Sequence, residues 1–458
     1  MRVIICGAGQ VGFGIARHLA AEGNDVTVVD RSSELIQRIN NTLDVRALVG
    51  HGSHPQVLED AGAEGADILI AVTASDEVNM VACQVALSLF SVPKRIARIR
   101  DQKYLEKEWK DLFSREELPV DVIISPERAV ADQVMRRLEI PGAYDTASFG
   151  NKNIQFLAIN LDENCPVLET PLKQLTDLFP DLQATVIAVK RDGKLFVPKS
   201  DDLMMAGDSA FLVTASEDCD RTMTIFGHEE QEARNLIIVG GGNIGYHVAR
   251  QLEKNGVRNS VRLIENSEIR ARNIAETLSD STVLLGSGLE PDILSEAGVR
   301  DAEILLALTN DDQVNLLTTM LARNEGCERA LCLINNTSFL PLGQSIGLDI
   351  SINPRAITVS SVLQHIRKGH VLAVHTIEDG EAEIIEAEVL ETSAFVGQKL
   401  RQLNLPDTMR IGAIYRNDEV MMPRGNFEFK VGDRIVLFVL TDAVNEAENF
   451  FSVGLEYF

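Results

Sequence analysis

Two glycine-punctuated turns carry the residues whose types and spacing could do chemistry. One lies in the segment VIICGAGQVGFGIARHLA near the start of the chain, and the other in LIIVGGGNIGYHVARQL near its middle. In the first, Gly7, Gly9 and Gly12 follow an apolar strand and open a helix, and Asp30 ends the next strand. Glycines at this spacing allow a tight turn, a close approach of a diphosphate and close packing of helix on strand. Backbone N–H groups at the helix start then bind anionic oxygens.

The acidic residue after each turn indicates which nucleotide would fit. A carboxylate at Asp30 accepts hydrogen bonds from both hydroxyls of an adenosine ribose and repels a 2′-phosphate, which favours NAD over NADP. The second turn repeats the set as Gly240, Gly242 and Gly245, with Glu265 ending the strand VRLIE. A purely structural role of the glycines remains the alternative. We expect two nucleotide-binding turns that are not functionally equal.

The turns belong to a duplicated chain. GHGSHPQVLEDAGAEGADILIAVTASDEVN and GSGLEPDILSEAGVRDAEILLALTNDDQVN match without a gap at an offset of 236 residues. Further on, VPKSDDLMMAGDSAFLV matches MPRGNFEFKVGDRIVLF at an offset of 225 residues. A fixed period of self-similarity identifies a repeat architecture. The chain is therefore predicted to be a tandem duplication.

Each copy is predicted to hold two kinds of domain. Its first part alternates continuous apolar strands with helices, which is typical of a parallel Rossmann-like sheet covered on both faces. Its second part has short strands with polar turns such as RDG, which suggests a small α+β module. Helices at 125–139 and 353–369 link the two. The expected α/β domains are 1–140, 141–230, 231–369 and 370–458.

Polar residues are expected at the carboxyl edge of each parallel sheet, where such folds bind ligands. Thr73 and Ala74 follow the strand ILIAV, and Thr309 and Asn310 correspond to them in the second copy. These residues could contact a ligand, or they could serve only to cap the helix that follows. Both roles can coexist, because both use groups at the strand-to-helix turn.

A pair of arginines distinguishes the copies. Arg98 and Arg100 lie two apart in RIARIRD, so we expect them to share one strand face. Burying both is costly unless an anion meets them, either a phosphate or a carboxylate across a subunit interface. The second copy has Leu333 and Asn335 at these positions. We therefore expect the two sites to differ in their grip on a polyphosphate.

Composition excludes several classes of partner. The 458 residues carry 43 Lys and Arg against 68 Asp and Glu, a formal net charge of −25, which repels nucleic acid and anionic lipid. No apolar run approaches the roughly 18 residues of a membrane span, and the start MRVIICG is not a signal peptide. The six cysteines form no CxxC pair, which predicts packed thiols. We expect an intracellular protein without nucleic-acid binding or direct membrane insertion.

The residues that catalysis would need are not evident. A dehydrogenase requires a proton donor or acceptor beside the nicotinamide. His51 and His54 in GHGSHP lie near the expected ligand edge, but polar loop residues are the simpler interpretation. No Walker string and no metal-ligand cluster occurs. Two binding turns without visible chemistry point to sensing, and we expect no catalytic residues and no metal.

The order of these parts resembles a known family. A Rossmann domain, a linking helix and a small α+β module are the parts of the RCK (or KTN) units that gate potassium channels and transporters. Two such units in one chain resemble the cytosolic subunits of bacterial Trk potassium-uptake systems over essentially all 458 residues. The strings GAGQVG, VVD, GHGSHP, VTASDEVNMVACQVA and RIARIR carry the resemblance in the first half.

The resemblance implies a role, ligands and partners. It implies a non-enzymatic protein that binds NAD(H) and ATP or ADP, and a homotetramer forming a ring of eight RCK units. The ring would sit at the cytoplasmic face of the inner membrane, beneath a membrane-embedded potassium-translocating subunit of the Trk type. The cofactor-binding positions of the first site are Gly7, Ala8, Gly9, Gln10, Val11, Gly12, Asp30, Arg31, Thr73, Ala74, Arg98 and Arg100. Those of the second are Gly240, Gly241, Gly242, Asn243, Ile244, Gly245, Glu265, Thr309 and Asn310.

Two other functions remain open from the sequence. One is an NAD-dependent oxidoreductase, which hydride transfer to a small substrate would reveal. The other is a passive scaffold with vestigial sites, which failure to bind NADH or ATP would reveal. The departures at Leu333 and Asn335 put phosphate binding by the second half in question.

Overall fold

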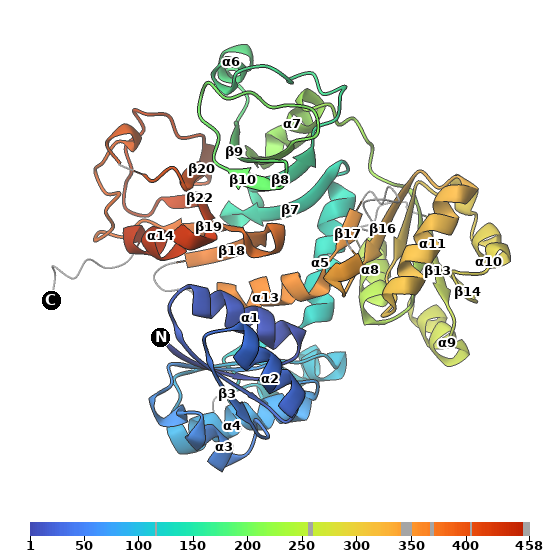
Figure 1. Ribbon diagram of the computed structural model, residues 1–458. Helices are drawn as coiled ribbons and strands as arrows, with labels where there is room; N and C mark the ends of the chain where they lie inside the picture. The colour runs from blue at the N-terminus through green and yellow to red at the C-terminus, as the bar shows by residue number, and fades with distance from the viewer. Residues whose placement is uncertain (115–116, 255–259, 340–349, 367–370, 404, 452–458) are drawn as a thin grey trace. The chain divides into compact units, whose positions relative to one another are not determined.

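The protein is divided into two compact units, and each contains segments of both copies (Figure 1). The structure is a computed structural model that describes residues 1–458 apart from 115–116, 255–259, 340–349, 367–370, 404 and 452–458. The first unit comprises Met1–Pro126, Arg355–Met409 and Gly425–Phe458. The second comprises Glu127–Pro354 and Arg410–Arg424.

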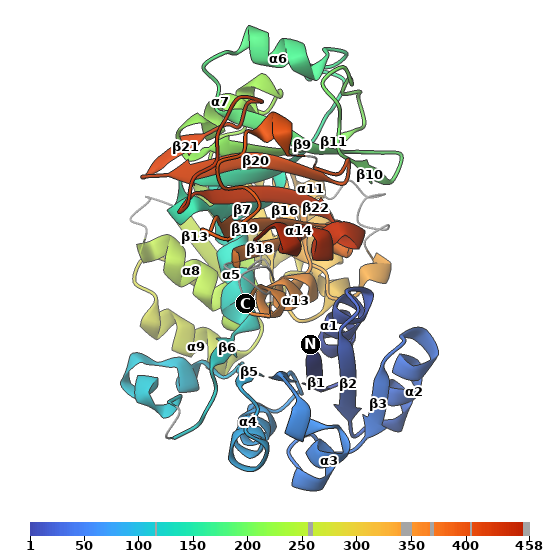
Figure 2. The ribbon, with the colours of Figure 1, turned by 90° about the vertical axis from the view of Figure 1, so that its left-hand side faces the viewer.

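The first unit contains a six-stranded parallel sheet. Its order is β3-β2-β1-β4-β5-β6, and β3, β2 and β1 lie side by side in Figure 2. Its strands are β1 (Arg2–Cys6), β2 (Asp25–Asp30), β3 (Arg46–Val49), β4 (Ile68–Ala71), β5 (Lys94–Arg98) and β6 (Val122–Ile124). The order reverses between β1 and β4, and such a switch point opens a crevice for a ligand at the carboxyl ends of the strands.

Alternation along β1 sends side chains into two separate cores. Val3 and Ile5 pack with Ile15 and Ile39 on one face, whereas Ile4 and Cys6 pack on the other. Helices therefore cover both faces, as continuous apolar strands require. The helices of this domain are α1 (Gln10–Ala21), α2 (Ser33–Thr42), α3 (Pro55–Asp60) and α4 (Asp76–Phe90).

Helix α13 (Pro354–Gln364), which follows the second Rossmann domain in the chain, packs into the core of the first. Val359, Val362 and Leu363 join the apolar cluster of β1 and α1. A Cβ atom on Gly14 of α1 would lie 2.9 Å from Val359 Cγ2, so the two helices are in close contact. Chain order had grouped this helix with residues 231–369, and its packing partner is the other copy. The expected domain boundaries stay predictions.

The second unit contains the repeat of this sheet. Its order is β14-β13-β12-β15-β16-β17, which matches the first sheet strand for strand. The strands are β12 (Asn235–Val239), β13 (Ser260–Glu265), β14 (Thr282–Leu285), β15 (Ile304–Ala307), β16 (Arg329–Leu333) and β17 (Ile350–Ile352). The helices are α8 (Asn243–Lys254), α9 (Glu268–Thr277), α10 (Pro291–Glu296) and α11 (Asp312–Glu325).

Helix α5 (Pro126–Glu139), which follows the first Rossmann domain, makes the reciprocal exchange. The Gln251 side chain on α8 donates a hydrogen bond to Asp132 on α5 at 2.8 Å. The buried Gln133 donates to Asp145 of the next strand at 2.9 Å. Each linking helix therefore belongs to the unit that contains the Rossmann sheet of the other copy.

Smaller antiparallel modules follow each Rossmann domain. The first has strand order β10-β9-β11-β8-β7. Its elements are β7 (Ala143–Phe149), β8 (Ile154–Asn160), α6 (Leu172–Leu178), β9 (Ala184–Arg191), β10 (Lys194–Phe196), β11 (Ser209–Ala215) and α7 (Cys219–Ile225). The corresponding elements of the second copy are β18 (Val371–Ile377), β19 (Ala382–Glu388), β20 (Met409–Arg416), β21 (Glu419–Met421), β22 (Arg434–Leu440) and α14 (Val444–Phe451). The predicted fold class, two tandem pairs of a Rossmann-like domain and an α+β module, is confirmed.

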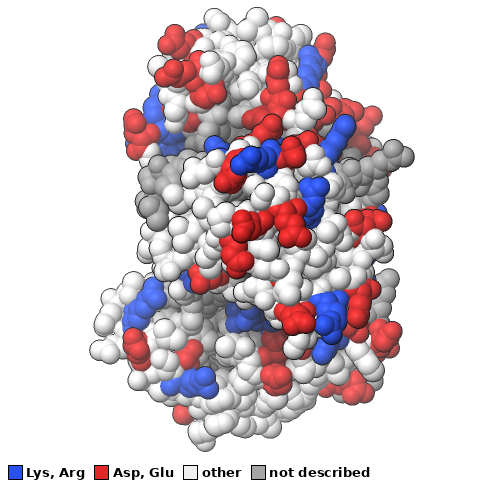
Figure 3. Space-filling model, turned by 90° about the vertical axis from the view of Figure 1, so that its right-hand side faces the viewer, with Lys and Arg blue, Asp and Glu red and all other residues white. Residues whose placement is uncertain are grey.

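Surface and thiol chemistry agree with the composition. All six cysteines are free and buried, which confirms the prediction of packed thiols. On the face drawn in Figure 3, acidic and basic side chains are interspersed. Within the described residues no helix has the length and apolar character needed to cross a membrane.

Candidate functional site

The three positions of the first turn are glycine for different structural reasons. Gly7 has a φ of +116°, in the left-handed region that favours glycine, and its N–H donates to Val29 O at 2.8 Å. A Cβ on Gly12 would lie 1.8 Å from the carbonyl oxygen of Gly7. A Cβ on Gly9 would meet no atom within 4 Å. The fold therefore requires Gly7 and Gly12, whereas Gly9 leaves space that the protein itself does not use.

The start of helix α1 faces that space. Gly9 is its N-cap residue, and no side chain of the described residues caps it. The first helical N–H groups of an α-helix have no partner within the helix and carry the positive end of its dipole. Open space beside such groups fits a bound phosphate. Of the flanking site residues, Ala8 and Val11 are buried and Gln10 is exposed.

Asp30 holds the turn in shape. One carboxylate oxygen accepts a hydrogen bond from Ala8 N at 2.7 Å, and the other accepts from Ser32 N at 2.8 Å. The carboxylate thus ties the glycine turn to the start of α2. Each oxygen retains a second lone pair, so a ribose hydroxyl can still donate to it. Arg31, beside it, is exposed.

A buried asparagine that sequence reasoning missed organises the other side of the turn. Asn79 is fully buried, and its side-chain oxygen accepts from Thr73 N at 2.9 Å and Thr73 Oγ1 at 2.7 Å. Its amide group donates to the carbonyl oxygen of Arg98 at 2.8 Å. It therefore joins the ends of β4 and β5. The signal was present, because the gapless repeat ends on an asparagine in both copies.

Thr73 and Ala74 lie at the carboxyl edge of the first sheet, as expected. The residue that caps helix α4 is the next one in the chain, Ser75. Ser75 is the N-cap of α4, and its hydroxyl accepts from Val78 N at 3.3 Å. Thr73 Oγ1 accepts from Ser75 N at 3.4 Å, so it supports the cap residue from two positions earlier in the chain. Ala74 is exposed.

The expected pair of buried arginines on one strand face is not what the structure has. Arg98 ends β5 and is half-buried, and its guanidinium donates to Thr73 O at 2.6 Å. Arg100 lies beyond the strand and is exposed, and its backbone N–H donates to Asp76 at 2.9 Å. The strand ends too early for the two-residue period to apply. The fully buried arginine is Arg95, which pairs with Asp121 at 2.7 Å.

The second turn repeats this construction. Gly240 has a φ of +103°, and a Cβ on Gly245 would lie 2.0 Å from Gly240 O. Glu265 accepts from Gly241 N and Ser267 N, both at 2.8 Å, and it is buried where Asp30 is half-buried. Around it, Gly242 and Ile244 are partly exposed and Asn243 is exposed. Glutamate therefore performs the structural task of the aspartate.

The opposite side of the second turn lacks the cation of the first. Asn315 binds Thr309 N at 3.0 Å and Thr309 Oγ1 at 2.6 Å, as Asn79 binds Thr73. Leu333 is buried, and the Asn335 side chain donates to Asp312. Because leucine and asparagine are uncharged, neither replaces the guanidinium of Arg98. Asn310 is exposed.

His51 and His54 lie near the same edge of the first sheet. The His51 and His54 rings stack with centroids 4.6 Å apart, and His51 Nδ1 lies 2.9 Å from Ser53 Oγ. Gly52 O accepts from the Cys6 thiol at 3.5 Å, which places this loop at the end of β1. Among the described residues, no group of three or more His, Cys, Asp or Glu side chains is arranged to hold a metal ion.

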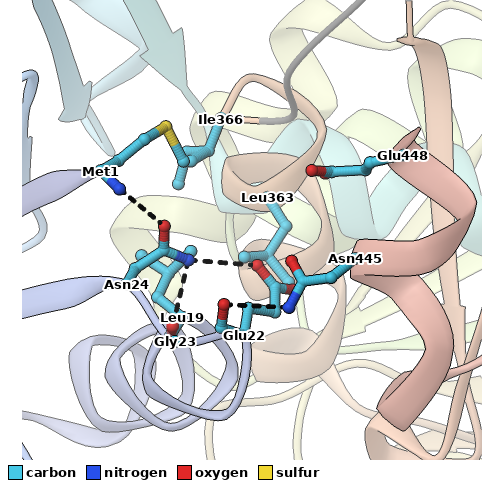
Figure 4. A pocket seen from close by; sticks show the side chains of 9 residues that line it. All are labelled: Met1, Leu19, Glu22, Gly23, Asn24, Leu363, Ile366, Asn445 and Glu448. Carbon is cyan, nitrogen blue, oxygen red and sulfur yellow. Dashed lines mark hydrogen bonds between the residues drawn. The ribbon is translucent and has the colours of Figure 1, made fainter. Parts of the chain in front are cut away.

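The far end of helix α1 borders a small polar pocket (Figure 4). It has a volume of about 130 Å³ and is lined by Met1, Leu19, Glu22, Gly23, Asn24, Leu363, Ile366, Asn445 and Glu448. The terminal ammonium of Met1 donates to Asn24 at 3.3 Å, and Asn445 on α14 donates to Glu22 O at 3.0 Å. Helix α1 thus begins at the glycine turn and ends against elements of the second copy.

Comparison with known proteins places the chain in a family. The TrkA-N domain model matches residues 3–126 and 236–354, and the TrkA-C domain model matches residues 156–227 and 384–452. A protein of Azorhizobium caulinodans named "Trk system potassium uptake protein TrkA" is 51% identical over 458 residues, covering 100% of both chains. Its name is that of a transport protein, in agreement with the expectation of a regulatory protein rather than an enzyme.

Solved structures share the fold at low sequence identity. The GsuK RCK domain has a TM-score of 0.60 and 17% identity, and the match covers 98% of this chain and 94% of that one. The GsuK channel bound to NAD has a TM-score of 0.59 and 18% identity, covering 97% and 77%. The duplicated glycine turns, the paired modules and the close relative together show that the chain belongs to the TrkA family of Trk-system potassium-uptake proteins.

Proposed function

We propose that the chain is the nucleotide-binding regulatory subunit of a potassium-uptake system. It binds NAD(H) and ATP or ADP, and ligand occupancy opens or closes a membrane-embedded potassium-translocating partner of the Trk type. It acts at the cytoplasmic face of the inner membrane, attached through that partner, as a homotetramer whose eight RCK units form a ring. Family membership and the related fold of an NAD-bound channel support this proposal.

The observation that carries the proposal is the unused space over Gly9. The turn, the start of α1 and the Asp30 carboxylate surround that space with groups suited to phosphate and ribose. A bound nucleotide would supply charge and contacts. The residues around the site would bind it, and none of them is assigned a catalytic role. Its effect is therefore expected to be mechanical.

Helix α1 provides a route from that ligand to the second copy. Its first turn would face the phosphates, its flank packs on α13 through Gly14, and its C-cap residue Glu22 accepts a hydrogen bond from Asn445. A helix is a stiff connector, so a shift at one end is passed to the other. A ligand that favours one position of α1 thereby favours one arrangement of the segments packed on it.

Potassium flux in proteoliposomes that contain the chain and a Trk-type membrane subunit tests the proposal. Gly9→Asp places a like charge where the diphosphate would lie, and Arg98→Ala removes a cation from the same site. Both variants are expected to lose the flux response to added ATP, ADP or NADH. Gly425→Asp is the matched control, because Gly425 is exposed and a Cβ there would have ordinary contacts.

An unchanged nucleotide response in Gly9→Asp would contradict the proposal. Consumption of NADH by the purified chain with a small substrate would instead favour an oxidoreductase. Failure of the wild-type chain to bind any adenine nucleotide would favour a scaffold.

A further inference from the structure

A guanidinium group lies beside the second glycine turn. An ideal Cβ on Gly242 would lie 3.8 Å from Nη1 of Arg270, which is in the first turn of α9. Arg270 is exposed, and no ion pair within the described residues involves it. Its neighbour Arg272 pairs with Glu268 at 3.1 Å. A cation therefore lies beside Gly242 of the second turn, whereas the equivalent Gly9 of the first turn has only open space.

The packing of α9 fixes this placement. Ile274 is buried one helical turn after Arg270, and its Cδ1 lies 2.5 Å from where a Cβ on Gly241 would be. Residues four apart share one face of a helix. Because Ile274 sits on Gly241, that face directs Arg270 toward Gly242. Glu265 holds the same part of the turn, since it accepts a hydrogen bond from Gly241 N at 2.8 Å.

The first copy has no cation at this place. Helices α2 and α9 correspond residue for residue, so Leu35 occupies the position of Arg270 and Ile39 that of Ile274. Leu35 packs against the apolar core of the first sheet. The cation of the first site is Arg98, at the end of β5, and its counterpart Leu333 is buried.

The cations therefore approach the two turns from opposite sides. Helix α9 follows β13, which neighbours β12 on one side, whereas β5 lies on the other side of β1, beyond β4. In a Rossmann domain the acid-bearing second strand holds the adenosine half of a ligand, and the diphosphate crosses the glycine turn. Arg270 comes from the α9 side, but its Nη1 lies 3.8 Å from an ideal Cβ on Gly242, so it reaches the place where that diphosphate would cross the turn. A cation at the end of β5 instead meets groups that extend past the turn.

We propose that Arg270 is a phosphate-binding, specificity-determining residue of the second site, and that this site takes a ligand whose negative charge is a diphosphate over the glycine turn. NAD and ADP-ribose are such ligands, and ATP, with a terminal phosphate extending past the turn, is not favoured. The inference rests on the proposed nucleotide-binding function. A guanidinium fork suits two phosphate oxygens, and its charge adds to that of the α8 start.

Calorimetric titration of the full chain tests this proposal. Gly9→Asp first disables the first site, so that only the second can respond. In this background NAD and ADP-ribose are expected to bind more tightly than ATP. Arg270→Leu, which installs the residue of the first copy, is expected to weaken NAD binding about tenfold, as loss of a charged phosphate contact does. Arg270→Lys keeps the charge without the fork and is expected to recover part of the loss.

Controls separate this contact from a general effect of charge or folding. Arg272→Leu removes the same charge from the same helix and is expected to leave the NAD affinity unchanged. Thermal unfolding is expected to be unaltered in Arg270→Leu, because Arg270 is exposed. Higher salt is expected to reduce the difference between wild type and Arg270→Leu, since exposed charge pairs are screened.

Several outcomes would overturn the inference. If NAD binds equally well to the chain with Arg270 and to the Arg270→Leu variant, Arg270 does not contribute to the site. Tighter binding of ATP than of NAD would show the wrong ligand class, and tighter binding of NADP would assign the guanidinium to a 2′-phosphate. If the Gly9→Asp chain binds no nucleotide while the wild type does, the second site fails and the first-site function stands. If neither binds, the proposed function fails as well.

Discussion

At the scale of single residues, the glycines of each turn divide into those the fold needs and those a ligand needs. Gly12 has no room for a side chain, because a Cβ would lie 1.8 Å from a backbone oxygen that cannot move aside. Gly9 has free space and an extended backbone with φ of −62°. The motif is therefore a mixture of packing and binding requirements, which sequence alone does not separate.

This division predicts opposite behaviour for two alanine substitutions. Gly12→Ala is expected to lower the free energy of unfolding by about 3 kcal/mol, the upper range for overpacking. Gly9→Ala is expected to change it by less than about 0.5 kcal/mol, as at other exposed positions, yet to weaken nucleotide binding at least about tenfold by crowding the diphosphate. Chemical denaturation and titration with NADH measure both effects. A destabilised Gly9→Ala chain, or one that binds normally, would contradict the assignment.

At the scale of elements, the exchange of linking helices brings segments of both copies together within each unit. Helix α13 fills the core face of the first sheet, and Lys94 of β5 donates to the backbone oxygen of His365 just after α13. His365 is partly buried, and burial, followed by the charge of Lys94, lowers the pKa of its imidazole below 6.5. Docking of the helix thus favours the neutral form of this histidine.

A lowered histidine pKa predicts loss of stability in mild acid. Above pH 6.5 the imidazole is neutral in both folded and unfolded chains. As the pH falls below 6.5, the unfolded chain takes up a proton first, so unfolding becomes more favourable until the folded pKa is passed. His247 in the second unit has its pKa lowered mainly by burial and behaves alike. The variant His247→Gln/His365→Gln is therefore expected to lose less stability between pH 6.5 and about pH 5, measured by urea unfolding. The same pH slope in both chains would refute this expectation.

At the scale of the whole molecule, duplication multiplies the number of sites that can act together. Moving a two-state population from 1:99 to 99:1 takes about 5.5 kcal/mol of differential binding, or roughly 10⁴-fold. One site typically contributes about 1–3 kcal/mol. The two sites of a single chain would reach this sum only at the upper end of that range, whereas the several sites of the proposed ring would reach it with ordinary coupling. Closed symmetry is also the usual form of assemblies of identical chains.

The expected assembly has a direct measure. Light scattering of the purified chain should give about four times its 50.3 kDa mass. In tetramers mixed from wild-type and Gly9→Asp chains, the nucleotide response of potassium flux should fall steeply with the variant fraction, because coupling energies add. A single-chain mass under conditions that preserve full nucleotide control of flux would rule out the ring.

The sequence was a sound guide wherever the cause was local. Periodicity predicted both parallel sheets, and glycine spacing predicted both turns, because strand burial and turn sterics act over a few residues. Asp30 and Glu265 were found at strand ends for the same reason. The gapless match at an offset of 236 residues corresponds to the same contact in both copies, since Asn315 accepts from Thr309 N as Asn79 accepts from Thr73 N.

Tertiary structure decided what depends on residues distant in the chain. The apolar face of α13 indicates burial, but nothing in it selects the sheet of the other copy, since apolar contact is not directional. Likewise the letters RIARIRD do not reveal that Arg95 is the buried arginine, because Asp121 meets it only after folding. Arg270 becomes a candidate phosphate ligand only when Ile274 has packed on Gly241. Local patterns determined which parts this chain has, and long-range packing decided which of them meet.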